Sequence, residues 1–408
     1  MRSTRSTNFR RPNSAMRIGL LSTSFPRAED DLAGSFVRGF ASALAARGHA
    51  IEVLAPAPSE PIHGEPPAWP GVSVEWVRYA PRAWQRSFYG AGVLDNLRSD
   101  PLSALGLAPF VAQLALETRA RVQHWDALIS HWAVPCALVA GELRGARPHL
   151  AVLHSADVFV LERLPRVMGR LLATRIAQNA DSLLCSSRDL RARFLALLAP
   201  LKRAEVAARA HVSAMGISPV APLTEYRDAL RARLGLDGLT ILSLGRLIPI
   251  KGIEHAIDAL PPDCSLVICG DGPARASMEQ RARGKRVRFM GNVFAQRKAE
   301  LLHASDLFVL PSVRLPNGRT EGMPQAILEA MEHGLPVIAS DVGGVSDVVR
   351  SGENGVLVSP ADVASLREAI SALRDPDLRA RLSADARATA AEYHWSELAP
   401  RIEALLDV

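Results

Sequence analysis

Short apolar runs alternate with amphipathic stretches along most of this 408-residue chain. Runs such as 241–244 and 307–310 are nearly continuous in Leu, Ile, Val and Phe, which is typical of strands buried on both faces of a parallel sheet. Between such runs the apolar residues recur at helical spacing, as in 35–47, which ends at Gly48. The alternation predicts an α/β protein built from doubly wound parallel sheets.

The predicted strands fall into two groups. The first group lies at 18–22, 51–55, 72–77, 127–130, 150–154 and 182–185. The second group lies at 241–245, 266–270, 287–290, 307–310, 337–339 and 356–358. After Pro360 only helical patterns remain, at 361–373, 377–391 and 396–406.

The length favours two or three domains, at roughly 150 residues each. A Pro-rich segment at 219–223 precedes a predicted helix at 224–234 and marks the domain boundary. We therefore predict a basic disordered tail (1–15), two Rossmann-like domains (16–219 and 220–385) and C-terminal helices that cross back to the first domain (386–408). A ligand is expected in the cleft beyond the carboxyl ends of the strands.

Composition and charge exclude several classes of protein. The four cysteines, none in a CxxC pair, lie in apolar runs, so we expect them buried and reduced. No apolar run approaches the ~20 residues of a membrane span. The formal net charge is +6, of which four charges come from arginines in the first eleven residues. This basic bias is weak evidence for nucleic-acid binding, and we expect no nucleic-acid partner.

The strongest candidate site begins at Glu321 and Gly322, before a predicted helix at 324–333. Pro324 suits the first turn of a helix, and Gly322 lets the backbone approach a ligand. The free amides of Gln325 and Ala326 would attract a phosphate. Carboxylates accept bidentate hydrogen bonds, so Glu321, and Glu329 in the second turn, suit sugar hydroxyls. A capped surface helix is the alternative.

A second candidate site follows the strand at 241–245. Arg246 and Lys251, on the loop after Gly245, could hold a diphosphate and stabilise its charge as it leaves. Ordinary surface cations are the alternative.

Three weaker signals lie elsewhere. His154 follows a buried strand, where a polar ring favours function, and Ser155 or Asp157 could cap the next helix. Gly34 and Ser35 open a helix after a strand. Gly270 and Gly272 follow another strand, but Arg275 occupies the sixth position of the dinucleotide-binding pattern, so an oxidoreductase is a poor match.

Together these segments resemble the retaining family-4 glycosyltransferases with the GT-B fold. The resemblance rests on GSFVRGFASALAARGH (34–49), HSADVF (154–159), GRLIPIKG (245–252), GDGP (270–273), EGMPQAILEAM (321–331) and GLPVIASDVGG (334–344). The stretches ISHWAVP (129–135) and PNGRT (316–320) are similar to members that build bacterial exopolysaccharide or lipopolysaccharide.

The resemblance implies a role for each matching residue. Glu321 would contact the donor sugar, Glu329 the ribose, and Arg246 with Lys251 the diphosphate. His154 would touch the sugar near the reacting carbon. The donor pocket would be completed by residues of four loops: Gly34, Ser35, Gly245, Gly270, Gly272, Gly322, Met323, Pro324, Gln325 and Ala326.

The sequence departs from the family at two loops. The segment 215–218 (Met-Gly-Ile-Ser) lacks the usual asparagine–glycine pattern and its acid, and Ala33 precedes Gly34 where members have a second glycine.

The expected enzyme is a metal-independent retaining hexosyltransferase without a cofactor. It would use a UDP- or GDP-sugar, with the first domain binding a glycan or lipid-linked saccharide, and would be cytoplasmic, with peripheral contact at the inner membrane face. A nucleotide-sugar epimerase of the same fold and a non-catalytic nucleotide-sugar-binding protein are the alternatives. Asp30 and Asp31 show no partner in the sequence, and Asp375 is expected to cap a helix.

The acceptor's expected surface is an irregular stretch at 80–101, beside Trp76. Trp84, Phe88 and Tyr89 on it could stack on sugar or lipid, although a packed loop is the better-supported interpretation.

Overall fold

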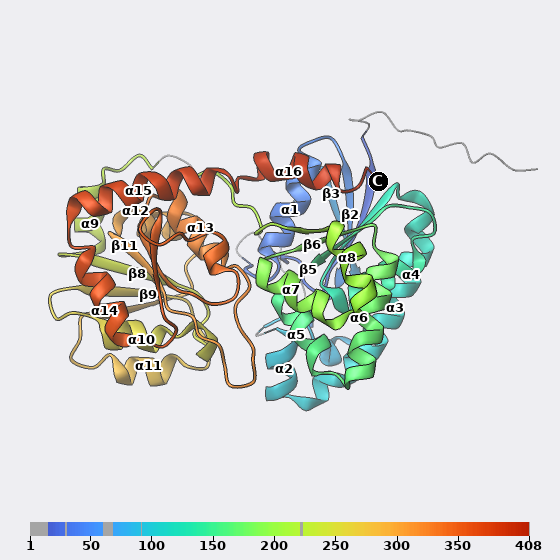
Figure 1. Ribbon diagram of the computed structural model, residues 1–408, viewed down its shortest axis with the longest axis horizontal. Helices are drawn as coiled ribbons and strands as arrows, with labels where there is room; N and C mark the ends of the chain where they lie inside the picture. Colours follow the sequence, from blue (N-terminus) through green and yellow to red (C-terminus); the bar gives the residue numbers. More distant parts are fainter. Residues whose placement is uncertain (1–14, 29–30, 60–67, 91, 221–222, 408) are drawn as a thin grey trace, which may run out of the picture.

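The computed structural model describes residues 15–28, 31–59, 68–90, 92–220 and 223–407, and it contains two parallel sheets side by side (Figure 1). The first sheet has the strand order β3-β2-β1-β4-β5-β6-β7 and the second β10-β9-β8-β11-β12-β13. The predicted fold class, two doubly wound parallel-sheet domains, is confirmed.

The elements of the first domain alternate between strand and helix. Its strands are β1 (Arg17–Leu21), β2 (Ala50–Pro56), β3 (Val72–Val77), β4 (Ala127–His131), β5 (His149–Leu153), β6 (Ser182–Cys185) and β7 (Ala210–Val212). Its α-helices are α1 (Ser35–Ala45), α2 (Val93–Ser99), α3 (Leu107–Arg121), α4 (Leu138–Leu143), α5 (Ser155–Arg163), α6 (Arg166–Asn179), α7 (Arg188–Leu197) and α8 (Pro200–Ala208).

The second domain repeats the pattern. Its strands are β8 (Thr240–Leu244), β9 (Ser265–Cys269), β10 (Val287–Gly291), β11 (Leu307–Leu310), β12 (Val337–Ser340) and β13 (Gly355–Val358). The helices from the boundary onward are α9 (Arg227–Leu234), α10 (Ile253–Ala259), α11 (Arg275–Arg281), α12 (Ala295–Ala304), α13 (Gln325–Glu332), α14 (Val363–Ala372), α15 (Pro376–Ala391) and α16 (Trp395–Ala404).

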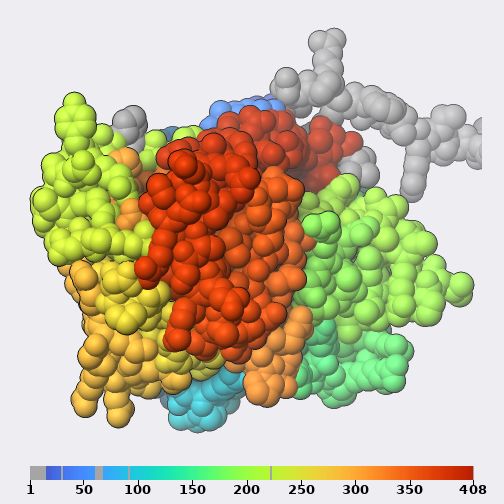
Figure 2. Space-filling view, turned by 60° about the vertical axis from the view of Figure 1, so that its left-hand side comes forward, coloured from blue at the N-terminus to red at the C-terminus, as the bar shows by residue number. Residues whose placement is uncertain are grey.

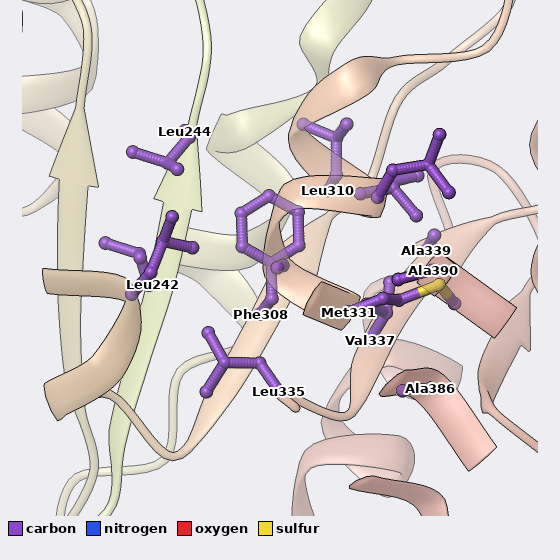
Figure 3. Close-up of a cluster of buried hydrophobic side chains, with 14 of the residues drawn as sticks. Leu242, Leu244, Phe308, Leu310, Met331, Leu335, Val337, Ala339, Ala386 and Ala390 are labelled. Atoms are coloured by element: carbon purple, nitrogen blue, oxygen red, sulfur yellow. The ribbon is translucent and has the colours of Figure 1, made fainter. Parts of the chain in front are cut away.

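The second sheet is covered on both faces because alternate side chains of each strand point to opposite sides. In β8, Leu242 and Leu244 join one apolar cluster, and Ile241 joins the other. Figure 3 shows the first cluster, in which β8 and β11 side chains lie near Met331 of α13 and Ala386 of α15. Met331 is fully buried, so α13 is fixed to the sheet that carries the neighbouring loops.

The first sheet is also covered on both faces. Ile18 and Leu20 pack on the side of α1, whereas Leu21 packs on the side of α3. A Cβ at Gly19 would overlap the Trp125 ring, so glycine at this position lets the indole lie against the strand.

The end of the chain crosses from the second domain to the first. Helix α15 packs on α13, and the segment after it pairs with Ile217, which donates to the Tyr393 carbonyl (2.9 Å) and accepts from the Trp395 amide (3.0 Å). Helix α16 then lies on α1 (Figures 1 and 2). It adds Leu398 and Ile402 to the first core, and Leu406, just after the helix, joins them. Two segments therefore connect the domains: the one that leads from Ile217 to α9 and the one between α15 and α16.

The structure confirms the twelve predicted strands but contains one more, β7, in the described part of the chain. β7 has three residues, of which one is buried, so it lacks the apolar run that marks the others. The helix expected at 224–234 begins later, at Arg227; Ala221 and Pro222 of the boundary and the tail residues 1–14 lie outside the described residues. The four cysteines are buried and free, as predicted.

Candidate functional site

The loops that carry the predicted donor site meet at the carboxyl edge of the second sheet. A Cβ on Gly270 would overlap the Gly245 carbonyl oxygen, and one on Gly272 would lie 2.5 Å from the Leu247 carbonyl oxygen. The loops after β8 and β9 therefore touch backbone to backbone, which only glycine permits here. The edge of the sheet is thus a closely packed set of loops.

Lys251 and Glu321 form an ion pair at this edge. The Lys251 Nζ lies 3.1 Å from Glu321 Oε1, and both side chains are 13% exposed. Lys251 ends a short 3-10 turn, Pro249–Lys251, and passes beneath Gly245, whose Cβ position is 3.4 Å from Lys251 Cε. The two candidate sites identified separately in the sequence are one site.

Helix α13 begins directly after this pair. Pro324 is the residue before the helix, so the prediction that the helix contains it is off by one position. The amides of Gln325 and Ala326 lie in the first turn, where a helix offers them no carbonyl partner. These amides and the helix dipole form an electropositive terminus next to Glu321.

Two consecutive glycines hold the backbone ahead of α13. Gly344 donates its amide to the Gly322 carbonyl (2.9 Å). Gly343 has φ +58°, and a Cβ there would overlap the Glu321 carbonyl oxygen. The loop that carries Glu321, Gly322 and Met323 is thereby fixed against the turn after β12.

Glu329 also has a lysine partner. Its Oε1 accepts from Lys298 Nζ at 2.7 Å, and the two side chains are 30% and 32% exposed. Lys298 lies on α12, so the carboxylate predicted for the ribose is held between two helices.

Asp95 of the first domain reaches the cations of the second. Arg319 donates to both Asp95 carboxylate oxygens (2.8 and 3.1 Å), and Arg246 Nη1 lies 3.9 Å from Asp95 Oδ2. Burial alone would raise the pKa of Asp95, but the hydrogen bond and charge of Arg319 and the charge of Arg246 outweigh burial and lower it. Asp95 of the first domain thus helps to orient the half-exposed Arg246 of the second domain.

The first domain faces this edge with His154 and the turns after β5 and β6. A Cβ on Gly322 would lie 3.3 Å from Ser186 Oγ and 3.6 Å from Ser155 Oγ. Since Ser155 follows His154 directly, the structure brings His154 and the Glu321–Gly322 loop to the same interface. Arg188 adds an ion pair across it, with Nε 2.6 Å from Asp347 Oδ1.

His154 belongs to a wall of rings. Its Nε2 lies 3.1 Å from His131 Nδ1, and the two rings stack with centroids 5.4 Å apart. Trp132 and Phe36 lie 5.0 and 5.1 Å from the His154 ring. Asp157 supports the arrangement because it accepts from the amides of both His154 (3.0 Å) and Ala133, so the expected capping role of Asp157 is confirmed.

Burial controls the protonation of this wall. It lowers the pKa of His154 to about 3 and that of His131 well below its ordinary value. Both imidazoles are therefore neutral near pH 7, and each offers one N–H donor and one acceptor. Burial also raises the pKa of Asp157 to about 7.

Gly34 and Ser35 lie at the start of α1. Gly34 has φ +73°, and its Cβ position is 2.5 Å from the Ser24 carbonyl oxygen. This position packs the start of α1 against the turn after β1. Gly34 and Ser35 have Ser24, Phe25 and Leu32 as neighbours, all of the first domain.

The atypical 215–218 loop contributes to the domain interface. Gln325 Nε2 donates to the Gly216 carbonyl (2.8 Å), and a Cβ on Gly216 would reach the Trp395 ring. The backbone of Gly216 thus contacts α13.

Two predictions about acids have different outcomes. Asp31 was expected to lack a partner, which is wrong: it accepts from Arg27 Nε at 2.6 Å and from the Ala33 amide at 3.0 Å. Arg27 lies four residues earlier on a turn, a proximity that a loop sequence does not reveal; Asp30 lies outside the described residues. Asp375 accepts from the Asp377 amide (2.9 Å) and caps α15, as predicted.

The segment predicted to be irregular at 80–101 is partly helical, because it contains the whole of α2 and the 3-10 turn Arg82–Trp84. Phe88 is buried, and the Tyr89 hydroxyl donates to the Pro56 carbonyl (3.0 Å), so this part of the packed-loop interpretation is confirmed. Trp76 of β3 is half-buried and Trp84 is 53% exposed.

The described residues offer neither a cluster of metal ligands nor a membrane-spanning helix. They contain no group of three or more His, Cys, Asp or Glu side chains placed to hold a metal ion. Within the same residues, no helix has the length and apolar character needed to cross a membrane.

Several site residues were missed in the sequence. Asp95, Arg319 and Lys298 each complete an ion pair with a partner on another element. His131 was not predicted as a site residue and was mentioned only as part of the segment 129–135. Long-range charge pairs leave no local pattern, whereas the position of His131 at the end of β4 could have indicated it.

Two family models match the chain. The model described as Glycosyltransferase Family 4 matches residues 33–209, and the one described as Glycosyl transferases group 1 matches 227–389. The two matches fall on the two sheet domains.

Curated relatives extend over much of the chain. A GDP-mannose-dependent monoacylated alpha-(1-6)-phosphatidylinositol monomannoside mannosyltransferase of Corynebacterium glutamicum is 31% identical over 291 residues, 67% of this chain and 74% of the relative. A glycogen synthase of Mycobacterium tuberculosis is 28% identical over 409 residues, 94% of this chain and 92% of the relative.

Solved structures share the fold. Anabaena HepE in complex with UDP-glucose has a TM-score of 0.69 at 21% identity, covering 95% of this chain and 98% of that one. WaaG, a glycosyltransferase involved in lipopolysaccharide biosynthesis, has a TM-score of 0.63 at 19% identity, with coverage of 95% and 99%.

Proposed function

The chain belongs to the family-4 glycosyltransferases with the GT-B fold, and from this premise we propose that it transfers a sugar with retention from a nucleotide-sugar donor. The donor is a UDP- or GDP-sugar, and the acceptor is a glycan or lipid-linked saccharide of bacterial surface polysaccharide synthesis. The names of relatives support this range: one uses GDP-mannose, and one neighbour holds UDP-glucose. The observation that carries the proposal is the Lys251–Glu321 pair at the N-terminus of α13.

The charges at this edge suit a leaving diphosphate. Lys251, Arg246 and the first amides of α13 all present positive charge or N–H donors to the same edge. Such groups, fixed before the reaction, stabilise negative charge as it develops. The pairing of Lys251 with Glu321 holds the ammonium group in place at little further entropic cost.

The proposed reaction is a front-face displacement. The bond between the anomeric carbon and the diphosphate oxygen breaks, and the acceptor oxygen bonds to the same face of that carbon. The leaving phosphate oxygen takes the acceptor's proton, so no side chain acts as a nucleophile. Glu321 and His154 position the sugar, with His154 as a neutral hydrogen-bonding ring because burial lowers its pKa to about 3, and Glu329 holds the ribose.

Donor hydrolysis by the native protein and by Glu321→Ala, measured across UDP-, GDP- and ADP-sugars, tests the assignment. We expect one donor to be cleaved by the native protein and not by the variant, while the exposed Glu279→Ala retains native activity. Conversion of the donor into an epimer without acceptor would instead identify an epimerase. Full activity of Glu321→Ala, or no cleavage of any donor even with acceptor present, would contradict the proposal.

The Lys251→Ala variant tests whether Lys251 acts in the chemical step or in binding of the nucleotide sugar. We expect kcat to fall by roughly 10²–10³ because the ammonium group that stabilises the developing negative charge is lost. The Kd of the nucleotide sugar should change less. An equal loss of binding with no further loss of rate would count against stabilisation in the transition state. Activity should also survive a chelator; loss that manganese restores would overturn the metal-independent mechanism.

A further inference from the structure

One stretch of the first domain exposes only apolar residues. It comprises the 3-10 helix Pro101–Gly106 and the first three turns of α3. From position 101 to position 118 the exposed residues are all apolar: Pro101, Leu102, Ala104, Leu105, Ala108, Pro109, Val111, Ala112 and Leu116. Positions 101–116 contain no Asp, Glu, Lys, Arg or His, whereas the outer face of a surface helix usually carries charged or polar residues.

These residues form one stripe along the outer side of α3. Ala108, Ala112 and Leu116 follow one another at a spacing of four, so they lie above one another on the same side of the helix. Phe110 and Leu114, on the opposite side, are fully buried. They pack in the core with Trp125 of the first domain. The stripe is therefore held outward by a helix that is fixed on its inner side.

Opposite charges lie at the two ends of the stripe. Asp100 precedes the 3-10 helix and accepts from the Leu102 amide (3.2 Å), and Arg86 Nη1 lies 3.7 Å from its carboxylate. Arg119 is exposed and follows Leu116 by three residues, on the same side of α3. A second chain laid antiparallel on the stripe would bring Arg119 of each copy to Asp100 of the other.

We propose that this surface, the α3 stripe (Leu102, Leu105, Ala108, Ala112 and Leu116), is the interface of a two-fold symmetric dimer of this chain. A two-fold axis pairs a surface with itself, so one stripe meets an identical stripe and both charged ends are matched. Depletion of charge is typical of the centre of a homodimer interface. The small side chains of Ala108 and Ala112 allow two helices to approach closely.

The exposed area of the stripe suits a protein partner. Leu102, Leu105 and Leu116 are 64%, 58% and 61% exposed. With the neighbouring alanines and prolines they offer on the order of 600 Å² of apolar surface, close to the ~800 Å² that each partner buries in a standard interface. A patch of this size lies at the upper end of what monomers expose. An anionic bilayer would gain little electrostatic attraction from a stripe whose centre carries no basic side chain.

A dimer through the α3 stripe would leave both sites open. Figure 1 shows α3 at the edge of the first domain that is remote from the second domain, whereas Lys251 and Glu321 lie in the second domain. The 3-10 helix packs against α2, which carries Asp95, so a partner copy would brace the helix whose carboxylate contacts Arg319. The dimer does not depend on the proposed reaction.

Sedimentation velocity of the full chain over a range of micromolar concentrations tests the inference. We expect a monomer–dimer equilibrium. Ala112→Glu would set two carboxylates against each other at the centre of the interface and should weaken the dimer by about a hundredfold or more. Ala384→Glu changes an exposed alanine of α15 in the same way and should leave the equilibrium native.

Charge exchange tests the antiparallel arrangement. Asp100→Arg and Arg119→Asp, made singly, should each weaken the dimer by about fivefold, because like charges then meet at both ends of the stripe. The double variant Asp100→Arg/Arg119→Asp should recover most of this loss. Such recovery reports on the contact between copies, since Asp100 and Arg119 lie at opposite ends of the stripe within one chain.

Three results would overturn the inference: a monomer at every concentration, a dimer that survives Ala112→Glu, or equal weakening by Ala384→Glu. Binding of a monomeric native chain to vesicles of phosphatidylcholine and phosphatidylglycerol, lost in Ala112→Glu, would assign the stripe to lipid and also overturn it. A double charge variant that is as weak as the single variants would contradict the antiparallel pairing.

Discussion

The two sides of the domain interface are built from different interactions. The second domain presents charge: Lys251 pairs with Glu321, and Lys298 pairs with Glu329. The first domain presents the neutral rings of His131, Trp132 and His154. The charged side depends on contacts that hold oppositely charged side chains together, whereas the neutral side depends on burial.

This difference predicts separate vulnerabilities. Altering the loops of the second domain should disturb catalysis first, because the ion pairs are held by backbone contacts. Acidification should disturb the first domain, because its buried imidazoles gain charge. Weakening the pairs across the interface should affect both sides only slightly, since partly exposed pairs contribute little.

Among the variants that test this difference between the two domains, the largest effect is expected from Gly343→Ala. The new Cβ would overlap the Glu321 carbonyl oxygen at a φ of +58°, so the Glu321 loop must move. We expect a loss of donor turnover of more than about tenfold and a stability cost on the order of 2–3 kcal/mol. Steady-state kinetics and urea unfolding measure the two effects.

Gly352→Ala is the matched control. Gly352 has φ +82° but nothing within 4 Å of its Cβ position, so it shares the backbone strain without the collision. Its turnover should be native, with a stability cost of about 1 kcal/mol. Equal turnover in the two variants would show that the Gly343–Glu321 contact does not position the site.

A second, intermediate effect concerns acid stability. His149 accepts from Ser130 Oγ (2.8 Å) and donates to the Asn179 carbonyl (3.0 Å), and burial lowers its pKa to about 4. Between about pH 4 and about pH 6.5, His149 binds a proton more readily in the unfolded chain than in the folded protein. Stability is therefore full above pH 6.5 and falls below it, by about 2 kcal/mol from His149 by pH 5.

Urea unfolding of the native protein and of His149→Gln at pH 7.5 and 5 measures this. The variant should be less stable at pH 7.5 but lose less on acidification, while the exposed His124→Gln should behave like the native protein. The pKa values of His131 and His154 are also lowered by burial, so these residues likewise make the folded protein less stable at low pH. An unchanged pH dependence in His149→Gln would contradict the burial argument.

The smallest effect is expected from Asp95→Asn, which weakens the contacts to Arg319 and Arg246 across the interface. Stability should change by less than about 1 kcal/mol. Donor Kd, measured by calorimetry, should rise by up to about fivefold, with less difference at high salt. Asp263→Asn removes a surface pair with Arg374 and should leave Kd unchanged; a similar rise there would show a general charge effect.

The fold was largely predictable because strands buried on both faces read as continuous apolar runs. β11, for example, is four buried residues in succession. β7 was missed because its pairing with β6 requires little apolar content of its own. The start of α9 was misplaced because Tyr226, 88% exposed, only precedes the helix.

The candidate site was predictable where its residues share a loop. Glu321, Gly322 and the start of α13 are adjacent in sequence, so helix-start chemistry indicated them together. The pairing of Lys251 with Glu321 brings together residues seventy positions apart, and Asp95 is 224 positions from Arg319. Such pairs depend on the assembled fold rather than on local pattern.

The crossing of the C-terminal helix has a consequence for synthesis. Leu398, Ile402 and Leu406 belong to the core around β1 and α1, yet a ribosome makes them only after the second domain. The second domain can bury its sheet as soon as α15 emerges, whereas the first must wait with part of α1 uncovered. The domain translated first is therefore the domain finished last, and a ribosome that stalls near residue 395 would release a chain with that apolar surface open to aggregation.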